Sequence, residues 1–322
     1  MSRMRELGST GIEVTRLCAG AAAWCSPDHP HGGIDAAESA ALADALFRSN
    51  VVRYLDTSNN YGGGESERRL GRALRAAHGI PAGFVLQTKA DRDMVTGDFS
   101  GSRMRASLEE SLDRLGLPHL PIVFLHDPEN TTWERAMAAD GPVAALVAAR
   151  EEGLIGHLGL SGGPVDLLIR FLETGHFEAV ITHNRYTLVD RSADPLLDLA
   201  SAQELGVLNA APYGGGMLTR WPVDRSRYAY GEAPAALIGA ANEMGRLCAD
   251  AGVPFAAAAL QFSTRDPRIT STIVGMRTVG DLEASIELDE FEIPGELWAA
   301  LLAVPLDPST WQDARSATEG RT

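Results

Sequence analysis

Short apolar runs alternate with helix-forming segments along almost the whole chain, and this alternation most constrains its fold. Because strand and helix alternate, the pattern predicts βα units and a parallel sheet of the α/β class. Eight runs of strand length fit one (β/α)8 TIM barrel. The expected strands are residues 16–21, 53–56, 84–89, 122–126, 157–160, 179–183, 207–211 and 271–274. Ala- and Leu-rich helical patterns lie between them, among others at 36–48, 104–115, 143–151 and 195–204.

The length suits one barrel with extra loops, so we expect a single domain over residues 1–322. A hydrophobic content of 45% is enough for a large core. The segment 213–233 is long, glycine-rich and aromatic, and is either a lid over a bound ligand or an ordinary surface loop. The polar tail, residues 307–322, has a composition typical of disorder.

Charge and composition exclude several classes of partner. A net charge of −15 argues against binding to nucleic acid or to an anionic membrane surface. The first six residues are not an apolar signal segment, and no apolar run has the length of a membrane span, so we expect a soluble cytoplasmic protein. Its three cysteines lack the spacing of a zinc site or a disulfide framework, so no metal is expected. The expected partner is a small molecule.

Four polar side chains of different chemistry stand at or just after the ends of three expected strands. Asp56 ends one strand and Tyr61 follows it, while Lys89 and His126 end the next two. The C-terminal ends of parallel barrel strands converge on one mouth, so these groups are expected to meet there. Each alone is more easily explained as a turn, packing, strand-end or core residue. Together they indicate proton transfer.

The chemistry of that set centres on the phenol. A free tyrosine has a pKa of ~10, so using it as a proton acceptor near neutral pH costs ~4 kcal/mol unless its anion is stabilised. The ammonium of Lys89 is expected to lower that pKa, and the carboxylate of Asp56 to keep the ammonium charged and oriented. The imidazole of His126 can hold the substrate oxygen by a hydrogen bond.

The same residues resemble a known family. The run 55–62, followed by Glu65, Thr88-Lys89 and Leu125-His126, is similar to the aldo-keto reductase superfamily, and the opening 7–14 is similar to its usual start. The resemblance spans about residues 5–288. It implies an NAD(P)-dependent oxidoreductase whose catalytic tetrad is Asp56, Tyr61, Lys89 and His126, with the cofactor lying across the barrel mouth.

The resemblance also implies residues that hold the nicotinamide. Ser161 corresponds to the family serine that binds the carboxamide, whereas the asparagine that usually follows is Gly162 here. The family's glutamine is replaced by either His183 or Asn184. Tyr213 either substitutes for the aromatic residue that stacks on the nicotinamide, or the stack is absent.

Cofactor choice is implied by the loop after the last strand. In NADP-using relatives this loop supplies a lysine, a serine and an arginine around the 2′-phosphate, and these fall on Gly275, Met276 and Asp281. NAD is therefore the better fit, with Asp281 accepting a hydrogen bond from the ribose. Asp281 is equally well explained as a first-turn helix residue. Arg277 could reach a 2′-phosphate, which keeps NADP open.

Within the superfamily, the stretches 160–162, 184–188 and 209–213 look most like the aldose 1-dehydrogenase branch. That branch includes L-fucose, D-threo-aldose and L-galactose dehydrogenases and pyridoxal 4-dehydrogenase, and it oxidises cyclic hemiacetals to lactones. Trp24 either stacks on the substrate ring or packs in the core. Two other functions stay open: an NADPH-dependent aldehyde or ketone reductase, and a nicotinamide-binding regulatory module.

Overall fold

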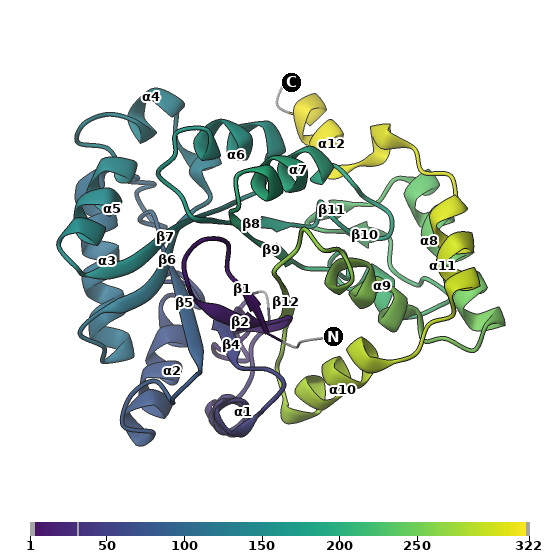
Figure 1. The fold of residues 1–322 in the computed structure, drawn as a ribbon, viewed down its shortest axis with the longest axis horizontal. Helices are drawn as coiled ribbons and strands as arrows, with labels where there is room; N and C mark the ends of the chain where they lie inside the picture. Colours follow the sequence, from purple (N-terminus) through teal and green to yellow (C-terminus); the bar gives the residue numbers. More distant parts are fainter. Residues whose placement is uncertain (1–3, 31, 320–322) are drawn as a thin grey trace.

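A closed barrel of parallel strands forms the centre of the molecule (Figure 1). The computed structural model describes residues 4–30 and 32–319. Its eight barrel strands follow one another around the ring in chain order, which confirms the predicted (β/α)8 TIM barrel. They are β3 (Leu17–Gly20), β4 (Tyr54–Asp56), β5 (Val85–Ala90), β6 (Leu120–His126), β7 (Ile155–Gly162), β8 (Ala179–His183), β9 (Gly206–Ala210) and β12 (Ser271–Gly275).

Helices surround the barrel and bury their apolar faces against it (Figure 1). The sequence marks several of their ends. For example, the Ser100 side chain accepts a hydrogen bond from the Arg103 N–H at the start of α3, and Gly116, at φ +70°, ends it. The helices are α1 (Ala36–Arg48), α2 (Glu65–Ala76), α3 (Gly101–Leu115), α4 (Trp133–Ala136), α5 (Pro142–Glu151), α6 (Val165–Leu172), α7 (Asp194–Ala202), α8 (Ala235–Asp250), α9 (Phe255–Thr264), α10 (Val279–Glu290), α11 (Gly295–Ala303) and α12 (Gln312–Glu319).

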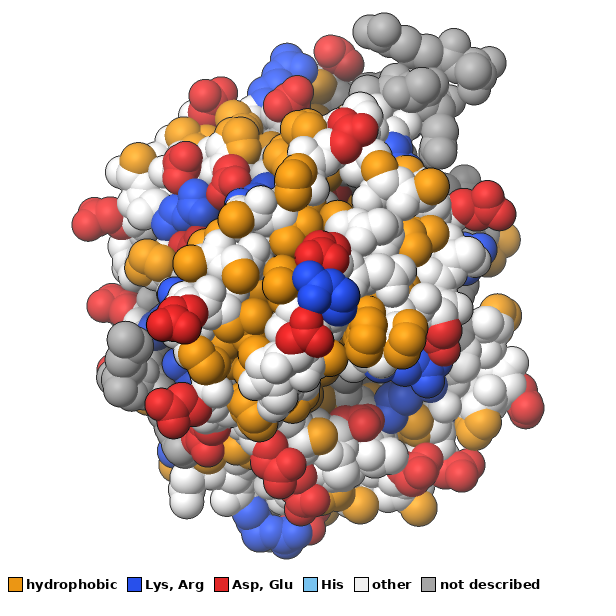
Figure 2. Space-filling model, turned by 90° about the vertical axis from the view of Figure 1, so that its right-hand side faces the viewer, with side chains coloured by type: hydrophobic (Ala, Val, Ile, Leu, Met, Phe, Trp, Pro, Cys, Tyr) orange, Lys and Arg blue, Asp and Glu red, His pale blue; other side chains and the backbone are white. Residues whose placement is uncertain are grey.

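The surface carries the acidic excess of the sequence. On the face shown in Figure 2, acidic side chains are scattered among apolar and neutral ones, in keeping with the net charge of −15. None of the described helices combines the length and apolarity that crossing a bilayer requires.

One end of the barrel is sealed and the other is open. A hairpin of β1 (Met4–Glu6) and β2 (Glu13–Thr15) contributes Leu7 and Val14 to an apolar cluster inside the barrel. That cluster includes Tyr54 and Phe124 from the barrel strands. Because the lower half is filled in this way, polar chemistry is confined to the C-terminal ends of the strands.

The segment 213–233 is anchored to the mouth instead of crossing it freely. It contains η2 (Met217–Thr219) and a small hairpin of β10 (Arg227–Tyr228) and β11 (Gly231–Glu232). Tyr228 is fully buried, and its hydroxyl donates to the backbone oxygen of Asn184 at 2.8 Å. The neighbouring Tyr230 is 70% exposed and meets the ring of His183 edge-on. Closure of this segment over a ligand stays a prediction.

Residues 308–319, part of the segment whose composition is typical of disorder, form secondary structure. They form η3 (Pro308–Thr310) and α12, and α12 lies beside α6 in Figure 1. The Asp313 carboxylate accepts from the Val165 N–H at 2.8 Å and pairs with Arg185. These polar contacts to the start of α6 and to the end of β8 hold a segment that has little apolar surface of its own. Residues 320–322 lie outside the described part.

A close helix contact gives a stability test. A Cβ added to Gly71 of α2 would lie 1.9 Å from the backbone oxygen of Arg114 in α3, so this glycine sets the distance between the two helices. We expect Gly71→Ala to lower the free energy of unfolding by about 1–3 kcal/mol, the usual cost of overpacking. Urea denaturation measures it.

The matched control is Gly239→Ala, because a Cβ at Gly239 in α8 would meet nothing within 4 Å. Helix propensity alone predicts a gain of up to about 1 kcal/mol there. Equal effects at the two glycines would contradict the assignment of Gly71 as a spacer.

Candidate active site

The ammonium of Lys89 is the centre of the open mouth. Its Nζ donates to both carboxylate oxygens of Asp56 at 2.7 Å, to the backbone oxygen of Thr57 at 2.8 Å and to the hydroxyl of Tyr61 at 3.0 Å. The side chains of Lys89 and Asp56 are only 2% and 3% exposed. Since Lys89 has three N–H donors, all of them are engaged, and the Tyr61 oxygen receives one while its own proton is free to point elsewhere.

Burial changes the expected acidity of the phenol. Desolvation raises the pKa of Tyr61 above its ordinary value, and this outweighs the lowering by the Lys89 ammonium. For Lys89, burial lowers the pKa, but the charge of Asp56 more than compensates, so the net pKa is raised. The expectation of a lowered phenol pKa is therefore corrected. Tyr61 carries its proton near neutral pH, and Lys89 makes loss of that proton less costly than burial alone would.

Asp56 also accepts from a chain of two buried side chains, Gln87 and Tyr54, which the sequence did not indicate. The Gln87 amide donates to Asp56 Oδ1 at 2.7 Å, and the Tyr54 hydroxyl donates to the other end of the Gln87 amide. The ionised carboxylate can only accept, so the amide NH₂ faces Asp56 and the amide oxygen accepts from Tyr54. Strand alternation could have indicated Gln87, because it precedes Lys89 by two residues and faces the same interior.

His126, at the end of β6, has a carboxylate partner, Asp91, which the sequence also did not indicate. Its Nδ1 lies 2.6 Å from Asp91 Oδ1, and its ring is 6.0 Å, centre to centre, from the ring of Tyr61. Burial lowers the pKa of His126, but the negative charges of Asp91 and Asp127 outweigh it and raise the pKa overall. Asp91 follows β5 directly, and its position two residues after Lys89 is the signal that could have revealed it.

The residues expected to hold the nicotinamide lie around the same mouth. Ser161 is buried on β7, where its Cα pairs with that of His126. His183 points inward, since it lies two residues beyond Ile181 of the interior cluster. Asn184 follows the strand at φ +58°, and its buried Oδ1 has no hydrogen-bond partner among the described residues. Such an orphaned amide oxygen fits a bound carboxamide.

The two aromatic residues expected to stack on a ligand, Trp24 and Tyr213, lie in different environments. Trp24 is 1% exposed within the main core, and its Nε1 donates to the Met276 backbone oxygen at 3.1 Å. No face of its indole is open to a substrate, so the structure favours core packing at this position. Tyr213 is half-buried after β9, against the main core, and burial raises its pKa.

The Asp281 carboxylate stabilises the loop that follows β12. The Asp281 carboxylate accepts from the backbone N–H groups of Arg277 at 2.7 Å and Thr278 at 3.0 Å, completing a capping box at the start of α10. Met276 is fully buried, whereas Gly275 is exposed, and a Cβ added there would meet nothing within 4 Å. Asp281 therefore has a structural role whatever it does for a cofactor.

The model of the aldo/keto reductase family matches residues 16–304. The chain belongs to the aldo/keto reductase family. It is 30% identical over 298 residues to D-threo-aldose 1-dehydrogenase of Pseudomonas sp, with 84% of this chain and 89% of the relative covered.

Other matches agree with the family. Pyridoxal 4-dehydrogenase of Microbacterium luteolum is 28% identical, with 93% of this chain and 96% of the relative covered. L-galactose dehydrogenase of Arabidopsis thaliana is 29% identical, with 96% of each covered. An aldo-keto reductase structure from Bacillus halodurans shares the fold with a TM-score of 0.78 at 19% identity, and covers 98% of this chain and 100% of its own. The protein is thus an NAD(P)-dependent oxidoreductase.

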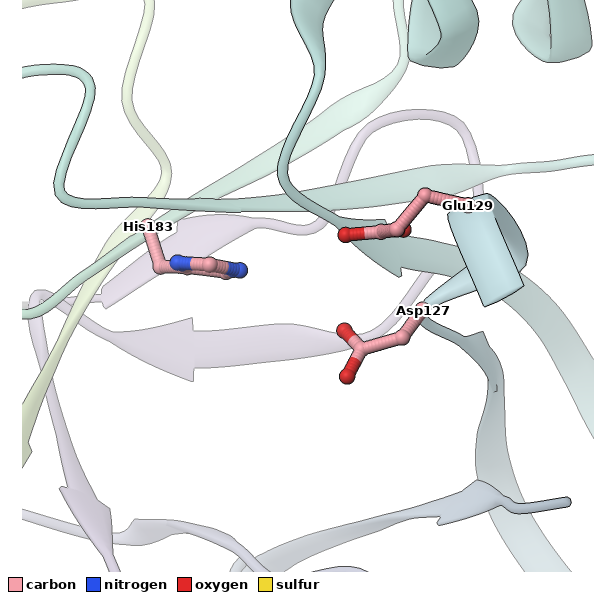
Figure 3. Close-up of side chains that lie close together, drawn as sticks. All are labelled: Asp127, Glu129 and His183. Atoms are coloured by element: carbon pink, nitrogen blue, oxygen red, sulfur yellow. The ribbon is translucent and has the colours of Figure 1, made fainter. Parts of the chain in front are cut away.

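Two carboxylates and an imidazole gather at the rim of this aldo/keto reductase barrel (Figure 3). The ligand atoms of Asp127, Glu129 and His183 all lie within 4.8 Å of one another. Burial, with Arg185 nearby, lowers the pKa of His183 to about 4, so this ring is neutral near pH 7. Acidic groups at an open rim are common without an ion, and we assign no metal to them. They supply hydrogen-bond acceptors.

Glu129 occupies the space that a side chain at position 162, which is glycine here, would need. A Cβ at Gly162 would lie 2.9 Å from Glu129 Oε2, and Glu129 Oε1 accepts from the Gly163 N–H at 3.0 Å. The carboxylate therefore stands where a side chain at position 162 would begin. Glu129 lies on η1 (Pro128–Asn130), in a loop whose path the sequence did not indicate.

Replacement of the phenol tests the proton-transfer site. We expect Tyr61→Phe to lower kcat by roughly 10²-fold or more, the scale of a general acid or base, because only the ionisable oxygen is lost. Steady-state kinetics measure kcat, and fluorescence titration measures cofactor affinity, which should barely change. A variant that keeps more than half of the wild-type kcat would show that Tyr61 does not transfer the proton.

Proposed function

We propose that this enzyme oxidises the cyclic hemiacetal form of an aldose to its lactone and uses NAD as the hydride acceptor. The observation that carries the proposal is the Tyr61 hydroxyl, held at 3.0 Å by Lys89 at the mouth, with its ring 6.0 Å, centre to centre, from the ring of His126. The similarity to D-threo-aldose 1-dehydrogenase, pyridoxal 4-dehydrogenase and L-galactose dehydrogenase supports this substrate class.

Side chains of the protein itself accept the proton of the substrate hydroxyl. The substrate hydroxyl sits between Tyr61 and His126. Tyr61 first loses its own proton to solvent, a step that the Lys89 ammonium makes less costly, and the phenolate then takes the hydroxyl proton as the C–H bond breaks. Lys89 steadies the negative charge on the phenol oxygen, and Asp56 keeps Lys89 charged and aligned. The nicotinamide, when bound, supplies the hydride acceptor.

The rim favours a neutral polyhydroxylated substrate. Asp127 and Glu129 accept hydrogen bonds from sugar hydroxyls, and neutral His183 can accept or donate. Two carboxylates would repel a phosphorylated or carboxylated aldehyde. A screen of L-fucose, D-arabinose, L-galactose and pyridoxal with NAD⁺, with a phosphorylated aldose as the anionic comparison, identifies the class.

The product distinguishes this function from the alternatives. Proton NMR of an early reaction mixture should contain a lactone that opens only slowly to the acid. Alcohol formed from an aldehyde with NADPH, together with no oxidation by NAD⁺ at alkaline pH, would favour the reductase instead. Negligible turnover with every aldehyde and aldose tried, despite cofactor binding, would favour a regulatory module.

NAD preference rests on three positions at the end of β12 and just beyond it. Gly275 has no side chain, Met276 is buried and Asp281 is anionic, so the cationic partners of a 2′-phosphate are absent from these positions. Arg277 is the nearby cation, and its guanidinium lies close to Gly32. A ribose 2′-hydroxyl suits this environment better than a phosphate.

A charge added at Gly275 tests this. The position has room for a side chain, so Gly275→Lys should raise kcat/KM for NADP⁺ relative to NAD⁺ by roughly tenfold, the scale of one charge-assisted hydrogen bond. Gly275→Gln, of similar length but uncharged, is the control and should change the ratio little. The unmutated enzyme should prefer NAD⁺, and a tenfold preference for NADP⁺ would overturn the assignment of this loop.

A further inference from the structure

We propose that Asp91 is a positioning residue that fixes the tautomer of His126, so that Nδ1 carries a proton and Nε2 faces the reacting oxygen as the group that gains and loses one. The proposal rests on the proposed function of His126 at the mouth. It adds a second carboxylate to the site, with a role different from that of Asp56.

The hydrogen bonds around Asp91 leave one arrangement. Oδ1 lies 2.6 Å from His126 Nδ1. Oδ2 accepts from the Asn60 backbone N–H at 3.0 Å and from the Ser58 hydroxyl. The charge of His126 and hydrogen bonds from these donors hold the pKa of Asp91 below its ordinary value, although burial acts against them. An ionised carboxylate only accepts, so Nδ1 must donate, and the second proton of the ring belongs on Nε2.

The backbone of Asp91 is fixed as firmly as its side chain. Its N–H donates to the Ser107 hydroxyl at 2.9 Å, and its backbone oxygen accepts from Arg103 at 3.2 Å. Both partners lie on α3. The carboxylate therefore has a defined position before any substrate binds, as expected for a group that orients a catalytic ring.

Other charges also face His126. Asp127 Oδ1 lies 3.6 Å from Nε2, on the side of the ring opposite Asp91. The titratable and charged groups around the ring are Asp91, Asp127, Lys89, Tyr61 and His183. Asp91 is the member of this set bonded to Nδ1, so a change there alters the tautomer as well as the pKa.

An amide at position 91 should reverse the tautomer. The Asn60 N–H cannot turn around, so in Asp91→Asn the amide oxygen must face it and the amide NH₂ must face His126. Nδ1 then has to accept, which places the ring proton on Nε2. The loss of the negative charge also lowers the pKa of His126, so both properties change in a stated direction.

Histidine ¹⁵N NMR of the ligand-free protein tests the tautomer without any substrate. In wild type, above the pKa of His126, we expect the Nδ1–H form, and in Asp91→Asn the Nε2–H form with a lower pKa. His126→Gln assigns the signal. Asp93→Asn is the matched control, because Asp93 is a half-buried carboxylate of the same loop whose Oδ1 accepts from the backbone N–H groups of Val95 and Thr96, away from the ring.

Kinetics then separate positioning from folding. With an active substrate, Asp91→Asn should lower kcat by roughly 10- to 100-fold and shift the His126 limb of the kcat/KM profile to lower pH, because the protonation state of Nε2 decides how the ring bonds the reacting oxygen. Asp93→Asn should do neither. An unchanged Nδ1–H tautomer in Asp91→Asn would overturn the proposal, and so would a reversed tautomer with an unchanged kcat. Because the NMR result needs no substrate, failure of the proposed aldose activity would not be mistaken for failure here.

Discussion

The ion pair between Lys89 and Asp56 is the interaction on which the mouth of the barrel depends. Removing two charges from water is costly, and such a pair persists only when the remaining donors and acceptors are satisfied. Here each ammonium proton has a partner, and Asp56 accepts from Gln87 as well. Because β4 and β5 are neighbouring parallel strands, the barrel brings these charges together before any ligand arrives.

Two carboxylates of this site each pair with a different basic side chain. Asp56 pairs with the ammonium beneath Tyr61, and Asp91 pairs with His126. The loop that joins β4 to α2 connects them, since its Ser58 and Asn60 bond Asp91 and its Tyr61 bonds Lys89. The phenol and the imidazole are therefore held by one short segment. These bonds fix the relative position of the two rings, which decides whether a substrate oxygen can touch both.

The barrel could be predicted because hydrophobic periodicity can be recognised in the sequence alone, without knowledge of tertiary contacts. The sequence also indicated Asp56, Lys89 and His126, since strand ends of a barrel share one mouth. It did not indicate Glu129, whose position depends on the path of a loop, or the fold of the tail, which Asp313 holds through contacts distant in sequence. The acidity of Tyr61 was misjudged for a related reason. Coulomb attraction to Lys89 could be anticipated from residue types, whereas the larger effect of burial required coordinates.

A double-mutant cycle on kcat tests the central claim that the ion pair and the phenol act as one unit. One arm is Tyr61→Phe. The other is Asp56→Asn with Lys89→Met, which removes both charges and avoids leaving one buried alone. If the ion pair works through the phenol, the combined variant should be about as slow as the slower arm, because groups that act as a unit are not additive. Losses that multiply across the two arms would mean that the ion pair and Tyr61 contribute independently, and would contradict the account.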